Sequence, residues 1–209
     1  EHALAQGRSA IVLVPEIALA MQMEKRFQNR FGAENVAILH SKLTTSKRLE
    51  NWLRIREGSA KVILGARTAI FAPVTDLGLV VIDEEHESTY KSDHNPKYET
   101  MDVAYKRAGT FGATVVLGSA TPSVVSFYRA SVGIYHLIEL KNRVGKSRLP
   151  DVEIEDIRGQ VARGRNEMIS LRLQGEMRYC LEKGEQVILF LNRRGYAPQI
   201  QCVECGYRY

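Results

Sequence analysis

The chain has 209 residues, 44% of them hydrophobic, and a formal net charge of +5 at pH 7. This length and composition suit one to one and a half globular domains with a sizeable apolar core, and no low-complexity tract is present. No run of eighteen apolar residues occurs, so no transmembrane helix and no membrane partner are expected. The modest basic excess is compatible with a polyanionic partner, and the odd cysteine count favours reduced thiols over disulfides.

Strands and helices are predicted to alternate over residues 1–140. Residues 1–7 have the composition of a helix end closed by a glycine. Apolar runs predict buried strands at 10–14, 36–39, 61–64, 79–82 and 114–117, and a further strand near 135–140. Helices are predicted from Pro15, from Thr44 or Thr45, at 102–108 and at 123–130. This order predicts an α/β fold built on a parallel sheet.

Several side chains between the motifs are interpreted as structural. In the third predicted helix the spacing places Leu49, Trp52 and Leu53 on the inward face, with Trp52 as a core anchor. His40 is interpreted as a hydrogen-bonded histidine at a strand end. Cys180 is interpreted as a core cysteine on a helix face.

Residues 141–150 are polar and basic and include Gly145 and Pro150, which predicts a linker. Beyond it, the patterns predict a strand at 152–157, a helix at 169–181 and a buried strand at 186–191. Residues 151–201 are therefore expected to begin a second α/β domain, and residues 202–209 to begin a region that contains a cysteine pair.

Two carboxylates, Asp83 and Glu84, directly follow the predicted strand at 79–82. In open α/β sheets, ligands bind at the carboxyl ends of strands, and Mg²⁺ is usually held by one or two carboxylates together with substrate phosphates. Asp83 suits that metal, and Glu84, one residue further on, suits the polarisation of an attacking water. The alternative is a buried strand that ends in a solvated acidic turn.

A segment with two hydroxyl side chains follows the next buried strand and favours the site over the acidic turn. Ser119 and Thr121 would stand at a neighbouring strand end, where they are placed to bond His86. A phosphate-binding loop is not found: Gly145 to Ser147 has the right ending, but position 140 is Leu140 where that loop needs glycine. No helix follows it either, so this segment is rejected as the loop. In proteins with the fold that these motifs resemble, the loop lies on the first strand, and it is therefore expected to precede Glu1.

Together these motifs resemble the bacterial primosomal replication-restart helicases, members of superfamily 2 with a DEAH/DExH box. The resemblance covers essentially the whole chain and is carried by the segments 13–19, 39–41, 65–73, 83–86, 118–123, 190–198 and 202–206. Three positions depart from the family pattern: Ala66-Arg67-Thr68, Val125 and the residues before Asp102.

The resemblance implies a P-loop NTPase (RecA-like) core: residues 1–140 as a first helicase lobe without its Walker A segment, then the start of a second lobe and of a zinc-binding region. It implies an ATP-dependent 3′-to-5′ DNA helicase that restarts stalled replication forks in the bacterial cytoplasm, at the nucleoid. ATP with Mg²⁺ and Zn²⁺ would be its cofactors. Single-stranded and forked DNA, primosome proteins and single-stranded DNA-binding protein would be its partners. This piece alone is expected to be inactive, and a binding module without catalysis or another DExH motor are the alternatives.

Within the resemblance, Asp83 would hold Mg²⁺, Glu84 would activate water, and His86 with Ser119 and Thr121 would couple hydrolysis to DNA. The predicted DNA-binding residues lie at strand ends and in the loop 87–100, and they are Pro15, Glu16, Arg67, Thr68, Tyr90, Lys91, Lys97 and Tyr98. For the strand ends the alternatives are ordinary helix initiation and a surface arginine. For the loop the alternative is that its tyrosines pack on the domain.

Cys202 and Cys205 form one C-x-x-C pair, which is half of a four-ligand zinc site. A redox pair is the competing interpretation, although no thioredoxin-like frame surrounds it. The resemblance implies zinc, with the remaining ligands supplied by further cysteines.

Overall fold

The computed structural model describes residues 1–142, 150–156, 169–190 and 205. The chain divides into two compact units, Glu1–Leu140 and Lys141–Tyr209, and each is considered by itself. No helix in these described ranges is long and apolar enough to cross a membrane. The run at 193–198 and Cys202 lie outside the described residues.

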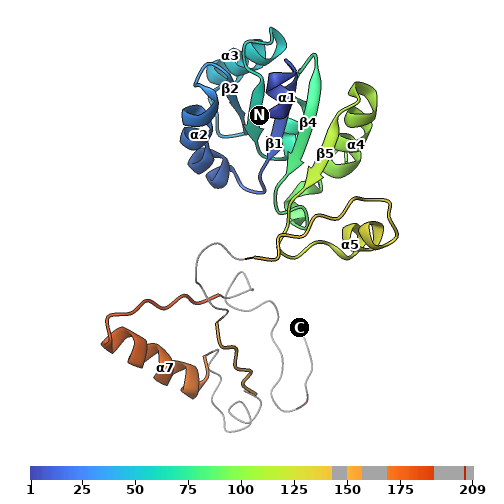
Figure 1. Cartoon of the computed structure of the whole chain (residues 1–209). Coiled ribbons are helices and arrows are strands. Elements are labelled where there is room, and N and C mark those ends of the chain that lie inside the picture. Colours follow the sequence, from blue (N-terminus) through green and yellow to red (C-terminus); the bar gives the residue numbers. More distant parts are fainter. Residues whose placement is uncertain (143–149, 157–168, 191–204, 206–209) are drawn as a thin grey trace. The chain divides into compact units, whose positions relative to one another are not determined.

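The first unit is built on a five-stranded parallel sheet in the order β2-β3-β1-β4-β5 (Figure 1). The strands are β1 (Ser9–Leu13), β2 (Val36–Leu39), β3 (Val62–Gly65), β4 (Leu77–Ile82) and β5 (Thr114–Leu117). Leu13 pairs with Gly65 and with Ile82, and Ile82 pairs with Leu117. The strands therefore end in register, and the residues that follow them gather along one edge of the sheet. The predicted parallel α/β fold is confirmed.

The helices begin and end near their predicted positions. They are α1 (His2–Ala5), α2 (Ile17–Phe31), α3 (Thr45–Arg56), α4 (Thr100–Phe111) and α5 (Val124–Ser131), with short 3₁₀ turns η1 (Arg67–Phe71) and η2 (Ser88–Tyr90). Thr44 caps α3, since its hydroxyl accepts from the Lys47 amide at 3.3 Å. Helices α2 and α3 pack on β2, and α4 packs on β4 and β5 (Figure 1).

The inward face of α3 differs from the prediction. Its buried residues are Asn51 and Ile55, whereas Leu49 is 57% exposed and Trp52 is 37% exposed with the Arg56 guanidinium 4.9 Å from its ring centroid. Asn51 Nδ2 donates to the Ile38 carbonyl at 2.9 Å. Because β2 is an edge strand, a carbonyl on its outer side has no partner strand, and a buried amide satisfies it. A rule that places only apolar side chains inside misses this arrangement.

Three predicted strands and the burial of a fourth are not found. Residues 135–140, 152–156 and 186–190 form no strand, and their apolar side chains are mostly exposed, as for Ile154 and Ile188. Strand β5 exists, but its residues alternate between exposed and half-buried. An apolar run becomes a strand only where a neighbour satisfies its backbone groups, and burial on both faces needs other elements packed over each face of the sheet. The predicted helix at 169–181 is confirmed as α7 (Leu171–Glu182), with Ser170 as its cap.

His40 is buried directly after β2, and its Nδ1 atom has no hydrogen-bond partner among the described residues. The expectation of a fully bonded histidine is therefore wrong for this atom. Burial lowers the pKa of His40, and the positive charges of Lys42 and Arg48 lower it further against the opposing effect of Glu24.

This burial predicts a pH-dependent stability. The folded-state pKa lies below the unfolded value of about 6.5, so the unfolded chain binds the proton more tightly. Neutral His40 therefore contributes its full share to the free energy of unfolding above the unfolded-state pKa. That share is lost as the pH falls from this pKa toward the folded-state pKa. His40→Leu should flatten this fall in urea midpoints measured at several pH values. His94→Leu, at an exposed loop position, is the control, and equal slopes in wild type and His40→Leu would contradict the prediction.

Candidate functional site

The turn from Asp83 to His86 is held between the ends of three strands. The Asp83 amide donates to the Leu13 carbonyl at 2.9 Å, which extends the pairing of β4 with β1. On the other side, the Gly118 amide donates to the Ile82 carbonyl at 2.9 Å, and the Glu85 amide donates to the Gly118 carbonyl at 3.0 Å. The pairing of the sheet thus continues past β4 and fixes the turn from both sides.

Asp83 and Glu84 are half-buried, with Asp83 Oδ1 accepting from the Glu84 amide at 3.2 Å. Glu84 has φ = 48°, a left-handed conformation that non-glycine residues seldom adopt. A β-carbon at position 118 would lie 3.4 Å from Asp83 Oδ1, which is an ordinary contact distance, so residue 118 directly neighbours this carboxylate. Asp83 therefore presents a hard oxygen ligand at a strand end, which fits a magnesium ion whose other ligands would come from substrate phosphates.

His86 makes the contacts that the sequence predicted. Its Nδ1 lies 2.8 Å from Ser119 Oγ, and its Nε2 lies 3.5 Å from Thr121 Oγ1. Ser119 Oγ also accepts from the Thr121 amide at 3.0 Å. Glu84 Oε2 stands 3.7 Å from His86 Nδ1. The ring therefore joins the acidic turn to the segment after β5, while a role in coupling stays a prediction.

Sequence reasoning passed over Glu85, the third carboxylate of the turn. It is 3% exposed, and its carboxylate accepts hydrogen bonds from Ser123 and Ser126. The available signal was a serine at the N-cap position of the predicted helix at 123–130, with a second serine one turn later.

Arg67 does not form a free surface cation. Its Nη1 donates to the carbonyls of Thr89 at 3.1 Å and of Lys91, and its guanidinium lies 5.8 Å from the Tyr98 ring centroid. Tyr98 in turn packs edge-on against Phe71 with ring centroids 5.0 Å apart. The arginine therefore holds the loop after the acidic turn. The other strand-end candidates are more open, since Glu16 and Thr68 are exposed and Pro15 is half-buried.

Tyr90 is buried, which corrects the expectation that it stacks on bases. It is 2% exposed, and its hydroxyl donates to the Asp83 carbonyl at 2.6 Å. Thr100 Oγ1 donates to the Tyr90 carbonyl at 2.7 Å. Burial raises the pKa of the Tyr90 phenol, and the charges of Asp83, Glu84 and Glu87 raise it further, so the hydroxyl remains a donor. The buried Tyr90 side chain thus connects the loop to the acidic turn through its bond to the Asp83 carbonyl.

The loop keeps an exposed basic surface. Lys91 and Lys97 are exposed, and Lys91 Nζ lies 3.6 Å from Glu99 Oε1. The Ser92 amide donates to the Tyr98 carbonyl at 2.9 Å, which closes the loop at its base. Tyr98 is half-buried. Of the four predicted DNA contacts in the loop, the two lysines are thus the accessible ones.

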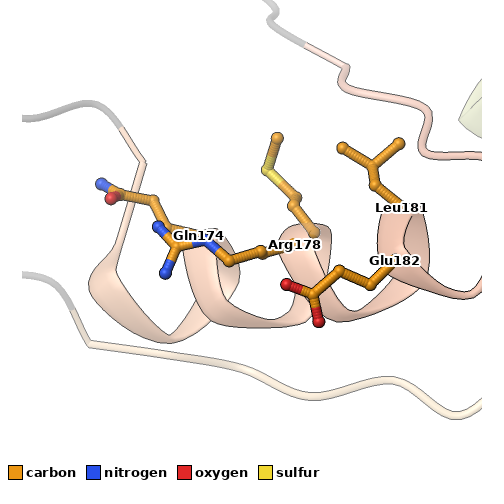
Figure 2. Close-up of a pocket in the computed structure, with 5 residues that line it drawn as sticks. Gln174, Arg178, Leu181 and Glu182 are labelled. Carbon is orange, nitrogen blue, oxygen red and sulfur yellow. The ribbon is translucent and has the colours of Figure 1, made fainter.

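A shallow hollow runs along α7 in the second unit, and it contains none of the candidate residues. Figure 2 shows its lining side chains on one helix, and they are Gln174, Met177, Arg178, Leu181 and Glu182. Cys180, on the same helix, is half-buried, whereas the sequence predicted a core position. Cys205 is exposed, and the described part of the chain has no group of three or more His, Cys, Asp or Glu side chains that could hold a metal. Zinc stays a prediction.

Comparison with known proteins identifies a family and several relatives of this chain. Residues 2–128 match the family described as DEAD/DEAH box helicase. The replication restart protein PriA of Bacillus subtilis is 46% identical over 99% of this chain and 26% of its own length. PriA of Treponema pallidum is 44% identical over 99% of this chain and 31% of its own length. The chain thus spans less than a third of either relative.

Solved structures give a weaker likeness. The helicase domain of Pyrococcus furiosus Hef has a TM-score of 0.42 and 20% identity, covering 58% of this chain and 26% of that one. A likeness of this size supports no statement about activity.

Proposed function

Because the chain belongs to the DEAD/DEAH box helicase family, we propose that it forms part of an ATP-dependent 3′-to-5′ DNA helicase that restarts stalled replication forks. The observation that carries the proposal is the acidic turn at the end of β4, bonded through His86 to Ser119 after β5. The names of the Bacillus subtilis and Treponema pallidum relatives support the link to replication restart.

In this proposal Asp83 holds Mg²⁺ together with the phosphates of ATP, and Glu84 accepts a proton from the attacking water. When bound, the ion supplies charge neutralisation at the phosphates. The chain itself contributes position: the Leu13 and Gly118 contacts fix the turn, and the Tyr90 hydroxyl fixes the Asp83 carbonyl. These bonds are made within the chain itself, so the protein alone fixes the turn and little reorganisation would be required at the reacting atoms.

For DNA binding, Lys91 and Lys97 would offset the negative charge of the phosphates. Thr68 and the amides at the start of α2, near Pro15 and Glu16, would contact the sugar-phosphate backbone of the DNA. Arg67 would act by holding the loop that carries the lysines. Single-stranded and forked DNA, other primosome proteins and single-stranded DNA-binding protein are the proposed partners. The proposed location is the bacterial cytoplasm at the nucleoid.

The test uses the full-length protein. ATP hydrolysis should rise on addition of single-stranded DNA, and a fork with a 3′ single strand should be unwound. ATP binding without turnover, with DNA or without it, would favour the alternative of a binding module.

Zinc is tested separately. We propose that Cys205, with Cys202, binds a structural zinc ion, so Cys205→Ser should lower the zinc content of the full-length protein. Elemental analysis of the purified variant measures this, with Cys180→Ser as the matched control. Equal zinc in wild type and Cys205→Ser would remove the pair from the ligand set.

A further inference from the structure

Glu85 is the acidic residue of the turn to which the proposed reaction gives no role. The residue is 3% exposed, and its carboxylate is bonded within the protein. Oε1 accepts from the Ser123 amide at 2.6 Å, and Oε2 accepts from Ser126 Oγ at 2.9 Å and from Ser123 Oγ at 3.2 Å. Every one of these donors is a neutral group at the start of α5.

The start of α5 is arranged around this carboxylate. Ser123 is the N-cap, and its hydroxyl accepts from the Ser126 amide at 3.2 Å. That hydroxyl has one proton, which it can give either to Glu85 or to Ser126 Oγ at 3.0 Å. The Ser123 amide and the Ser126 hydroxyl are therefore the constant donors. A negative charge at a helix N-terminus is stabilised by the free amides and the helix dipole.

His86, the next residue, bonds the same segment near its beginning. It contacts Ser119, whereas Glu85 contacts Ser123 and Ser126. Two neighbouring residues of the turn thus hold residues 118–126 at both ends. Glu84 stands immediately before them in its left-handed conformation, which persists only where the surroundings impose it.

We propose that Glu85 is a positioning residue, which fixes the conformation of Glu84 and joins the acidic turn to the N-terminus of α5 so that the turn and residues 118–126 move as one unit. The proposal rests on the proposed function, because its effect on rate requires that Glu84 act in ATP hydrolysis. Glu85 touches no reacting group. It acts by limiting the turn to one conformation.

The first test is kinetic and uses Glu85→Gln in the full-length protein. The amide keeps the shape and one acceptor for the Ser123 amide, but it removes the charge and one acceptor oxygen. The kcat of DNA-stimulated ATP hydrolysis should fall roughly tenfold, as for residues that orient a metal site, with little change in KM for ATP or in Tm. Ser126→Ala should do the same, and the double variant should lose less than the two losses multiplied. Glu57→Gln, at an exposed glutamate after α3, is the control.

The second test is amide hydrogen exchange in the nucleotide-free protein. Exchange should accelerate at the Ser123 amide in Glu85→Ala, since that amide loses its acceptor, and also at the amides of Glu84 to Glu87. If Glu85→Ala fails to fold, Glu85→Gln is used instead; it keeps an acceptor for the Ser123 amide, so faster exchange is then expected at the amides of Glu84 to Glu87, and unchanged exchange there contradicts the proposal. Faster exchange at the Ser123 amide, with unchanged exchange at the amides of Glu84 to Glu87, would contradict the proposal that the turn and residues 118–126 move as one unit. An unchanged kcat in Glu85→Gln would overturn the positioning role. Absence of DNA-stimulated hydrolysis in the wild type would defeat the proposed function, while exchange would still decide whether the unit exists.

Discussion

Glu84→Gln in the full-length protein is expected to abolish ATP turnover while ATP still binds. The amide preserves the size of the side chain at the half-buried position after Asp83, but it cannot accept a proton. Loss of a general base typically costs about 10²- to 10⁴-fold in rate, which places the variant near the detection limit of a steady-state assay. Turnover is measured with saturating single-stranded DNA, and binding with a fluorescent ATP analogue.

The same assay on Glu57→Gln shows whether loss of a distant carboxylate matters. Asp83→Asn supplies the second comparison, since it should weaken Mg²⁺-dependent nucleotide binding, which Glu84→Gln should leave intact. DNA-stimulated hydrolysis at the wild-type rate in Glu84→Gln would remove this residue from the mechanism.

Tyr90→Phe is expected to impair hydrolysis although the aromatic ring remains. A phenylalanine stacks on a base as well as a tyrosine does, so a base-stacking role predicts no effect. The structure instead gives the hydroxyl a bond to the part-buried Asp83 carbonyl, and loss of such a hydrogen bond costs about 0.5–1.5 kcal/mol. The expected result is a lower kcat with a modest fall in unfolding free energy.

Tyr90→Ala should be far more harmful to the fold, because deletion of a buried aromatic side chain costs about 3–5 kcal/mol. Tyr128→Phe, at a position that is 63% exposed, is the matched control for the hydroxyl. Urea unfolding and DNA-stimulated ATPase rates are measured for all three variants. Wild-type ATPase rates in Tyr90→Phe would contradict a role for the bond between the Tyr90 hydroxyl and the Asp83 carbonyl.

The strands of the first unit were predictable because their signals are local. Apolar runs located β1 to β5 to within a few residues, and Thr44 located the start of α3. Asp83, His86 and Ser119 could be brought together from sequence because residues after parallel strands meet at one edge of the sheet.

Other features depend on partners that are distant in the sequence. Asn51 is buried because β2 lies at the sheet edge, and strand order is not readable from residue periodicity. The residues around Tyr90 in the sequence are polar, as in a surface loop. Its hydroxyl nevertheless donates to the Asp83 carbonyl, and its ring packs in the core. Glu85 was missed because a buried carboxylate is uncommon, and its serine donors stand some forty residues away.

The left-handed backbone conformation of Glu84 is expected to lower the thermal stability of the fold, while the proposed reaction requires a glutamate at this position. A left-handed φ is tolerated far better by glycine or asparagine than by glutamate, so the residue that we propose to activate water is among the less suitable ones for its own conformation. A laboratory selection for heat resistance alone would favour replacing it and would yield well-folded, inactive molecules. If the proposed hydrolysis is correct, directed evolution of a more heat-resistant variant therefore has to screen for turnover and for folding at the same time.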